Sequence, residues 1–415
     1  MERFIRALRH RNFRLYFSGQ VVSLVGTWTQ QVAMAWLVYR MTGSPLLLGL
    51  IGFSGQIPIL IFAPFGGLWS DRFNRRSVLI VTQTLAMVQA FILAALVFSG
   101  WVQVWHLILM AISLGVIHAL DAPARQAIVV QLVADRNDLS NAIALNSFAI
   151  NSARLIGPTF AGVLVTFYGE AICFLLNGFS YLAVLVALRM MRIQDSPRQP
   201  HSLIGGFKQG VAYAYRFAPV RTLLILVATV SFTITPYVVL MPIYAKHTFN
   251  GNAQTLGWLL ASAGLGALLA TIYLASRRTI IGLGNVIIGG ALAAGVGLMI
   301  FAYSETFWVS VPALVMLGFG VISVAASSNI VIQTIVPDAL RGRVMSLYTM
   351  SFLGVAPLGA LAAGTVANYV GAPATLFAGG IVSTVAAYFF ARQLPGLRKL
   401  VRPIYIEQGI LNETE

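Results

Sequence analysis

The chain has 415 residues, of which 58% are hydrophobic and 9% are charged, and its mean hydropathy is +0.83. Soluble globular proteins carry about a quarter charged residues, so this composition excludes that class and indicates a protein with many membrane spans. A net charge of +15 would suggest nucleic-acid binding in a soluble protein. Here the arginines stand between apolar runs, and we expect no nucleic-acid partner. The single cysteine, Cys173, excludes an intramolecular disulfide and a cysteine-based metal site.

Runs of about twenty or more apolar residues predict membrane-spanning helices. The first run follows a basic N-terminal segment, but it is longer than the apolar core of a signal peptide and has no cleavage site, so we expect it to remain as the first span. The predicted fold class is an all-α membrane protein with twelve transmembrane helices. They are expected near residues 14–39, 45–70, 77–98, 102–132, 139–167, 171–191, 220–245, 253–276, 283–303, 307–336, 344–370 and 373–393.

The basic residues predict the topology. Of the 27 lysines and arginines, Arg125 and Arg154 fall inside spans, while Arg40 and Lys246 fall on the side opposite the N-terminus. The other 23 lie on the N-terminal side, so the positive-inside rule places both termini in the cytoplasm. We expect a multi-pass monomer of a bacterial inner membrane, surrounded by membrane lipids.

One long connection divides the chain. Residues 1–191 hold six spans, residues 192–219 form a cytoplasmic linker, residues 220–393 hold six more spans, and residues 394–415 form a cytoplasmic tail. Within the linker, Leu203, Phe207, Val211 and Tyr215 recur at near-helical spacing, which predicts an amphipathic helix on the inner leaflet. A plain solvated linker is the alternative.

The two halves carry traces of an internal repeat. Two sets of identities keep a constant offset, which is 208 positions for Gly43, Gly49 and Ser54 and 202 positions for Gln131, Gly162 and Gly169. Many transporters are built from parallel repeats, with the substrate site between the halves near the bilayer midplane. The sequence therefore predicts two pseudo-symmetric six-helix halves.

A charged loop between the second and third spans carries a motif that reads Gly-x-x-x-Asp-Arg-x-x-Arg-Arg. Its members are Gly67, Asp71, Arg72, Arg75 and Arg76. The motif resembles the signature loop of the major facilitator superfamily, which has a glycine where this chain has Asn74. We expect Asn74 to adopt the left-handed turn that asparagine tolerates.

This loop is also a candidate gate. The eleventh span begins near Val344 at the same membrane face, so its positive helix end and Arg343 are expected to meet Asp71 when the cytoplasmic side closes. A basic cytoplasmic loop without a gating role is the alternative.

The fifth span carries a second motif. Gly157, Pro158 and Gly162 resemble the Gly-Pro-x-x-Gly-Gly signature of the antiporter branch of the same superfamily, with Ala161 in place of one glycine. This resemblance implies export rather than uptake. Ordinary packing of small residues between membrane helices is the alternative.

Ionisable residues inside the spans are candidates for ion coupling, because each is costly in the membrane. Asp121 and Arg125 belong to a segment, Asp-Ala-Pro-Ala-Arg, that looks like the bacterial exporter branch that includes the enterobactin exporter and macrolide efflux proteins. The resemblance covers the chain up to Pro395. At ~1.5 Å per residue, Asp121 lies about 15 Å and Arg154 about 24 Å from the cytoplasmic face.

Either Arg125, one helical turn away, or Arg154 can therefore be the partner of Asp121. We expect these three residues to form a coupling site in which a change of partner loads and releases a proton. A fixed ion pair that only sets helix packing is the alternative.

Spans one, four, seven and ten are expected to line a cavity. Polar side chains in the middle of a span need water or a ligand, because an unpaired polar group in hydrocarbon is costly. The candidates for the substrate cavity are Gln30, Gln31, Asn151, Tyr237 and Asn329.

These features predict a secondary transporter, not an enzyme, that exports a small amphipathic or hydrophobic compound against protons and uses no cofactor. The chain has no phosphate-binding Gly-Lys-Ser/Thr loop, so ATP does not drive it directly. A lipid or metabolite transporter of the same fold is an alternative. A remote alternative is an intramembrane serine protease, with Ser54 in a Gly-x-Ser-Gly segment as nucleophile and His118 as base.

Overall fold

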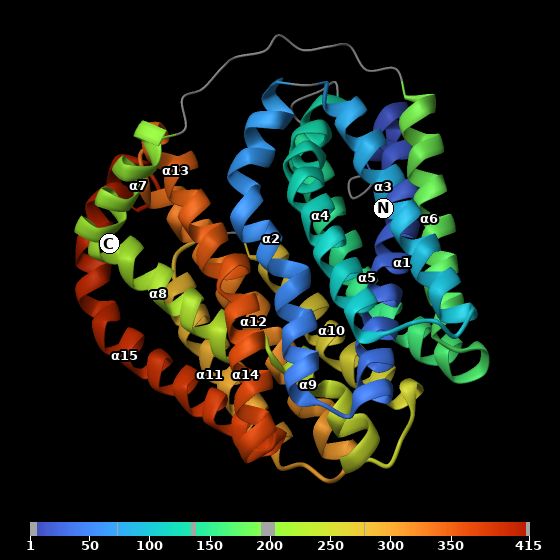
Figure 1. Cartoon of the computed structure of the whole chain (residues 1–415). Helices are drawn as coiled ribbons and strands as arrows, with labels where there is room; N and C mark the ends of the chain where they lie inside the picture. The colour runs from blue at the N-terminus through green and yellow to red at the C-terminus, as the bar shows by residue number, and fades with distance from the viewer. Residues whose placement is uncertain (1–5, 73, 134–137, 192–203, 278, 412–415) are drawn as a thin grey trace. The chain divides into compact units, whose positions relative to one another are not determined.

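The computed structural model describes residues 6–72, 74–133, 138–191, 204–277 and 279–411. These residues form helices joined by short turns, and none of them lies in a strand (Figure 1). Twelve segments among them are long and apolar enough to cross a membrane. The predicted class, an all-α membrane protein with twelve spans, is confirmed.

The first six spans are single helices that follow a short 3-10 helix, η2 (Arg6–Arg9). The turns that join them are short, as in antiparallel helical hairpins. The helices are α1 (Arg11–Thr42), α2 (Pro45–Arg72), α3 (Arg75–Phe98), α4 (Val104–Leu132), α5 (Leu139–Tyr168) and α6 (Glu170–Met190).

The second six spans follow the short helix α7 (Ile204–Arg216), and two of them are interrupted. The seventh span consists of α8 (Ala218–Thr233), α9 (Tyr237–Ile243) and the π-helix η4 (Tyr244–Thr248). The eleventh consists of α13 (Asp338–Thr349), the π-helix η5 (Met350–Gly354) and α14 (Ala356–Val370). The continuous helices are α10 (Ala253–Ser276), α11 (Leu283–Ala302), α12 (Phe307–Ile335) and α15 (Ala372–Glu407).

Two glycines with positive φ form equivalent turns in the two repeats. Gly169 joins α5 to α6 with a φ of 80°, and Gly371, which lies 202 positions later, joins α14 to α15 with a φ of 85°. A residue with a Cβ atom is strained in this region of backbone conformation. The repeat seen in the sequence thus includes a shared turn that favours glycine.

A proline lies beside each interrupted segment, where it has no N–H to donate to the preceding helical turn. Pro236 precedes α9, and Pro357 follows the π-helix η5. The two interruptions are in contact: the Ser231 hydroxyl on α8 donates to the carbonyl oxygen of Phe352 in η5. A side chain therefore binds a carbonyl of the interrupted helix, where regular i to i−4 bonds are lost.

Helix α15 continues past the expected end of the twelfth span. We predicted a tail after residue 393, but the helix runs through Pro395 and Pro403 to Glu407. Leu394, Leu397 and Val401 share one face of this extension and are buried. Burial of these apolar side chains offsets the hydrogen bonds that the prolines remove.

The contacts divide the chain into two compact units. Unit 1 comprises Met1–Pro200 and Val239–Gly264, and unit 2 comprises His201–Val238 and Leu265–Glu415. Unit 1 is larger than the predicted N-terminal half, since it includes the segment from Val239 to Gly264.

Helix α7 lies where the linker was expected to form an amphipathic helix. The side chains of Leu203 and Phe207 are outside the described residues, while Val211 and Tyr215 are exposed. A Cβ at Gly210 would lie 2.9 Å from the Cβ of Arg343. Within unit 2, α7 is therefore packed closely against α13.

Gly359 on α14 permits the close approach of α8. A Cβ at position 359 would overlap the carbonyl oxygen of Phe232, whereas a Cβ at Gly289 on α11 would meet nothing within 4 Å. Alanine stabilises a helix by about 0.5–1 kcal/mol relative to glycine where there is room, and overpacking costs about 1–3 kcal/mol. We expect Gly359→Ala to lower the unfolding temperature of the purified protein and Gly289→Ala to maintain or raise it. Equal unfolding temperatures for the two variants would contradict the close α8–α14 contact.

Candidate functional site

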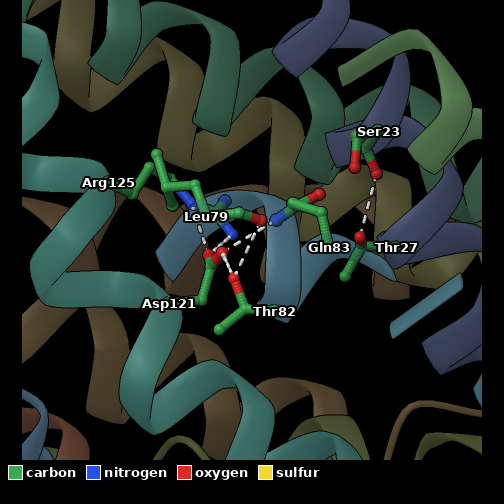
Figure 2. A network of polar contacts seen from close by, with 7 residues as sticks. All are labelled: Ser23, Thr27, Leu79, Thr82, Gln83, Asp121 and Arg125. Atoms are coloured by element: carbon green, nitrogen blue, oxygen red, sulfur yellow. Dashed lines mark hydrogen bonds and ion pairs between the residues drawn. The ribbon is translucent and has the colours of Figure 1, made fainter. Parts of the chain in front are cut away.

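A polar network between α3 and α4 surrounds the carboxylate of Asp121, which is 1% exposed (Figure 2). The Thr82 hydroxyl and the Gln83 side-chain amide each donate to its Oδ1 atom at 2.8 Å. Arg125 donates to Oδ2 from Nε at 2.8 Å and also from Nη2. Each of the two carboxylate oxygens therefore accepts two hydrogen bonds.

The local sequence explains this arrangement. Asp121 and Arg125 are four residues apart on α4, so they lie on the same helical face. Thr82 and Gln83 are adjacent on α3, which pairs with α4 through the short connection after Phe98. A buried charge is tolerated when it is paired and its remaining lone pairs are hydrogen-bonded, and this carboxylate meets both conditions.

The two charged side chains differ in their access to the surface. The side chain of Arg125 is 27% exposed and that of Asp121 is 1% exposed. The carboxylate is therefore enclosed, whereas part of the Arg125 side chain reaches the surface of the described residues.

Arg154, the third predicted coupling residue, interacts with an aromatic ring. Its guanidinium carbon lies 5.2 Å from the centroid of the Trp28 indole on α1. The structure brings Asp121 and Arg125 together as an ion pair, and the role of the three residues in coupling remains a prediction.

Gly157 of the antiporter-like motif positions Trp28. A Cβ at 157 would overlap the Cβ of Trp28 and would lie 3.2 Å from the carbonyl oxygen of Val25. The Thr29 hydroxyl on α1 also lies 3.4 Å from the Gly157 carbonyl oxygen. Close contact of α1 with α5 therefore depends on the absence of a side chain at residue 157.

The other two motif residues face α10 within unit 1. A Cβ at Gly162 would lie 2.9 Å from the carbonyl oxygen of Ala253, and a Cβ at Gly257 would lie 2.5 Å from that of Pro158. Glycines on both helices thus bring the backbones of α5 and the first part of α10 together. The motif residues serve packing in this structure, and their role in export remains a prediction.

The signature loop is only partly described. Gly67, Asp71 and Arg72 belong to α2, but their side-chain surroundings lie outside the described residues, and the predicted contact of Asp71 with Arg343 is untested. Arg343 itself donates from Nη1 to the Gln209 side chain on α7. Its recorded partner therefore lies on the helix that precedes the seventh span.

The loop's remaining basic side chains donate to carbonyl oxygens. Arg75 reaches Ala127 at 3.5 Å, and Arg76 reaches Arg189 at 3.0 Å. The predicted left-handed turn at Asn74 is wrong, because this residue is extended, with a φ of −61° and a ψ of 120°.

Asn74 instead caps α3. Its side-chain oxygen accepts from the N–H groups of Arg76 at 2.9 Å and of Ser77 at 3.3 Å. Asparagine is a preferred N-cap residue, so the departure from the family's glycine has a local explanation in the helix that follows.

The predicted cavity residues differ in their exposure. Gln30 is 2% exposed, donates to Gln89 at 3.1 Å and accepts from Asn177 at 2.8 Å, so its amide is used between helices. Its neighbour Gln31 is exposed, and Asn151 is partly exposed.

In the second half, Tyr237 and Asn329 are also partly exposed. The Asn329 side chain accepts a hydrogen bond from Gln333 at 2.6 Å. Whether these positions line a substrate cavity remains a prediction.

Sequence reasoning missed four residues that complete the buried networks. They are Thr82, Gln83, Gln89 and Asn177. All four are polar residues inside apolar spans, and this pattern could have identified them.

Twelve apolar spans among the described residues, with a hydrogen-bonded carboxylate–guanidinium pair inside one of them, fit a secondary transporter of the major facilitator fold. The sequence model of the transmembrane secretion effector family matches residues 5–400, and the chain belongs to this family. Its members and relatives are transporters, so the chain is not an enzyme and the alternative of a serine protease based on Ser54 and His118 is rejected.

Relatives and solved structures agree with this assignment. The chain is 25% identical over 387 residues to the staphyloferrin A transporter of Staphylococcus aureus, covering 92% of this chain and 96% of that protein. It is 24% identical over 396 residues to the multidrug efflux pump Tap of Mycobacterium tuberculosis, covering 93% and 94%. A bacterial homologue of the human lysosomal transporter Spinster matches with a TM-score of 0.70 at 15% identity, covering 92% and 96%, which shows the shared fold.

The contrast between Gln30 and Gln31 can be measured by labelling. In a Cys173→Ser background, we expect the Gln31→Cys variant to react rapidly with a thiol reagent and the Gln30→Cys variant to react slowly, because only residue 31 is exposed. Comparing a membrane-impermeant with a lipid-soluble reagent separates a water-exposed position from a lipid-facing one. Equal labelling of the two variants would contradict the orientation of α1.

Proposed function

We propose that the protein exports a small amphipathic or hydrophobic compound in exchange for protons, and that Asp121 and Arg125 are the coupling pair. A carboxylate inside the membrane is costly unless it is paired, and such groups are often parts of proton relays. Asp121 is enclosed by hydrogen-bond donors, while the side chain of its partner Arg125 is partly exposed. This arrangement suits a carboxyl group that exchanges a proton and a partner together.

The observation that carries the proposal is a comparison of the two repeats. At the offset of 202 positions, Asp121 corresponds to Ser323 and Arg125 to Ser327 on α12, and both serines are fully buried. At the offset of 208, Thr82 corresponds to Gly290 on α11, and a Cβ there would lie 2.9 Å from the Cβ of Ser323. The second repeat therefore packs the equivalent helices with small residues and no charge.

This internal comparison argues against a purely structural ion pair. If the fold required an ion pair at this contact, the second repeat would need one as well. A buried ion pair also stabilises a protein little, since desolvation offsets most of the attraction. A role in coupling explains why only one repeat carries the charges.

A proton on Asp121 would change what the carboxyl group requires. The neutral acid no longer needs the positive charge of Arg125, and it can donate its own hydrogen bond. Arg125, freed from the pair, would then be able to take another partner. Loss of the proton reverses the change, so each cycle carries one proton per rearrangement.

Export is supported by the motif and by the relatives. The motif of Gly157, Pro158 and Gly162 resembles that of antiporters, and the relative Tap bears the name of an efflux pump. We also propose a monomer in a bacterial inner membrane with both termini in the cytoplasm, on the basis of the 23 basic residues on the N-terminal side.

The proposal predicts that the ion pair of the first repeat can be replaced by the two serines found at the equivalent positions of the second repeat. A double variant with Asp121→Ser and Arg125→Ser reproduces the pair that packs α12, so we expect it to fold with nearly unchanged thermal stability. Transport should lose its dependence on the proton gradient. This dependence can be measured in everted vesicles, as the transport of a panel of dyes, drugs and siderophores with and without the ionophore nigericin.

Asp138→Asn is the matched control. It removes a carboxylate that pairs with His10 at 3.1 Å and Arg6 at 3.7 Å outside the Asp121 network, and gradient dependence should persist. A double serine variant that folds and transports with undiminished gradient dependence would refute the coupling role. If the double variant does not fold, the same assay on the Asp121→Asn variant tests the coupling role.

A further inference from the structure

Helices α8 and α15 of unit 2 pack as an antiparallel pair, which the proposed proton coupling does not involve (Figure 1). Near the start of α8, the Thr222 hydroxyl donates to the Gln393 side-chain oxygen on α15 at 3.3 Å. Farther along, a Cβ at Gly379 of α15 would lie 2.6 Å from the carbonyl oxygen of Thr233 on α8. Residue numbers rise along one helix as they fall along the other, so the start of α8 and the late part of α15 lie at the same end of the pair.

Two arginines lie on one side of this pair. Arg221 precedes Thr222 and Arg392 precedes Gln393, so each is rotated by about 100° from the residue that faces the other helix. Because the helices are antiparallel, both rotations lead to the same side of the contact. Both arginines are exposed. Packed helices lie about 8–10 Å apart, so the two long side chains can reach a single ligand.

Apolar side chains continue from the two arginines along the same side. They stand four, seven or eleven residues from the arginine of their own helix, so they share its face. An exposed apolar face on a membrane span contacts acyl chains. We refer to this face as the α8–α15 seam; it consists of the two arginines and of the exposed side chains of Ile225, Ile381, Val385 and Tyr388.

The protein partners of the two arginines are neutral. The Arg221 guanidinium lies 5.7 Å from the centroid of the Tyr215 ring and donates to the Tyr215 carbonyl oxygen at 3.1 Å. The Arg392 guanidinium lies 5.9 Å from the centroid of the Tyr388 ring. Among the described residues, neither arginine forms an ion pair with a carboxylate. Rings and carbonyls orient a guanidinium without removing its charge, so two positive charges stand at one end of the apolar seam.

The position of these charges favours a lipid headgroup. The topology proposed above places this end of both helices at the cytoplasmic face. The exposed Tyr215 ring at the end of α7 fits the aromatic belt of a membrane interface. Basic sites between spans on this side of a membrane bind anionic headgroups, and guanidinium groups match the geometry of phosphate oxygens. A soluble phosphate could contact the arginines but would make no use of the apolar side chains.

We propose that the α8–α15 seam binds one anionic phospholipid of the inner leaflet. The phosphodiester lies between Arg221 and Arg392, and an acyl chain follows Ile225 and Val385. Because Arg221 also contacts Tyr215, the bound lipid holds the end of α7 at the membrane surface, directly before the seventh span. This site goes beyond the proposed export and does not depend on proton coupling.

Native mass spectrometry of the purified full chain tests the site. The protein is titrated with anionic phosphatidylglycerol, with zwitterionic phosphatidylcholine, and with glycerol 3-phosphate, which lacks acyl chains. We expect phosphatidylglycerol to bind about tenfold or more tightly than either of the others, because each arginine near the membrane surface attracts an anionic lipid. The double variant with Arg221→Gln and Arg392→Gln should bind the two lipids alike.

A second double variant, with Arg277→Gln and Arg398→Gln, is the matched control. It also removes two positive charges from unit 2, and their partners are again neutral: the Tyr273 ring at 5.8 Å and the Asn285 side-chain oxygen at 2.7 Å. The preference for phosphatidylglycerol should not change. Loss of the preference in this control as well would show a general effect of charge and overturn the proposal.

If the variant with glutamine at residues 221 and 392 does not fold, lysine at both positions replaces it. The Arg221→Lys and Arg392→Lys double variant should still prefer phosphatidylglycerol but bind it several-fold more weakly, because lysine lacks the planar fork of donors.

Equal binding of the two lipids by the unmodified protein overturns the proposal, as does a folded glutamine or lysine variant with unchanged affinity for phosphatidylglycerol. Glycerol 3-phosphate that binds as tightly as phosphatidylglycerol indicates a site for a soluble phosphate and overturns the lipid proposal too. None of these results bears on proton coupling by Asp121, because that role is measured by the gradient dependence of transport.

Discussion

The carboxylate of Asp121 sets a strict requirement on unit 1. An ionised carboxylate in a low-dielectric interior is stable only when a cation and hydrogen-bond donors surround it. Thr82 and Gln83 on α3 and Arg125 on α4 supply these groups, so the two helices must hold one register. The second repeat forms its α11–α12 contact with Gly290 and neighbouring small residues and has no such requirement. The charged network is therefore a feature added to a packing scheme that works without it.

The two arginines inside the spans of unit 1 differ in their partners. Arg125 bonds a carboxylate, and a guanidinium in that state is neutralised locally. The Arg154 guanidinium lies over the Trp28 indole, and this cation–π contact orients it. Gly157 connects this contact to the antiporter-like motif, because close packing at this glycine sets where Trp28 lies. Through Trp28, the motif therefore affects the position of the Arg154 guanidinium as well as the contact of α1 with α5.

Much of the fold follows from the sequence, since long apolar runs and positively charged loops reflect the membrane itself. Which face a side chain presents does not follow. Gln30 and Gln31 are adjacent and chemically equal, but one step along a helix rotates the side chain by about 100°, and only the rotation of α1 decides that Gln30 is buried. Asn74 was misjudged because capping of the next helix competes with the turn. Likewise, Pro395 did not end its helix, because tertiary burial outweighed a local preference.

The central claim is that Asp121 takes up and releases a proton during transport. Infrared difference spectroscopy of the purified protein in lipid, recorded between acidic and neutral pH, observes the C=O stretch of a protonated carboxyl group directly. The account predicts a band that appears on acidification, is missing from Asp121→Asn and is retained in Asp138→Asn. An identical spectrum for Asp121→Asn and the unmodified protein, over the pH range in which a gradient drives transport, would contradict it.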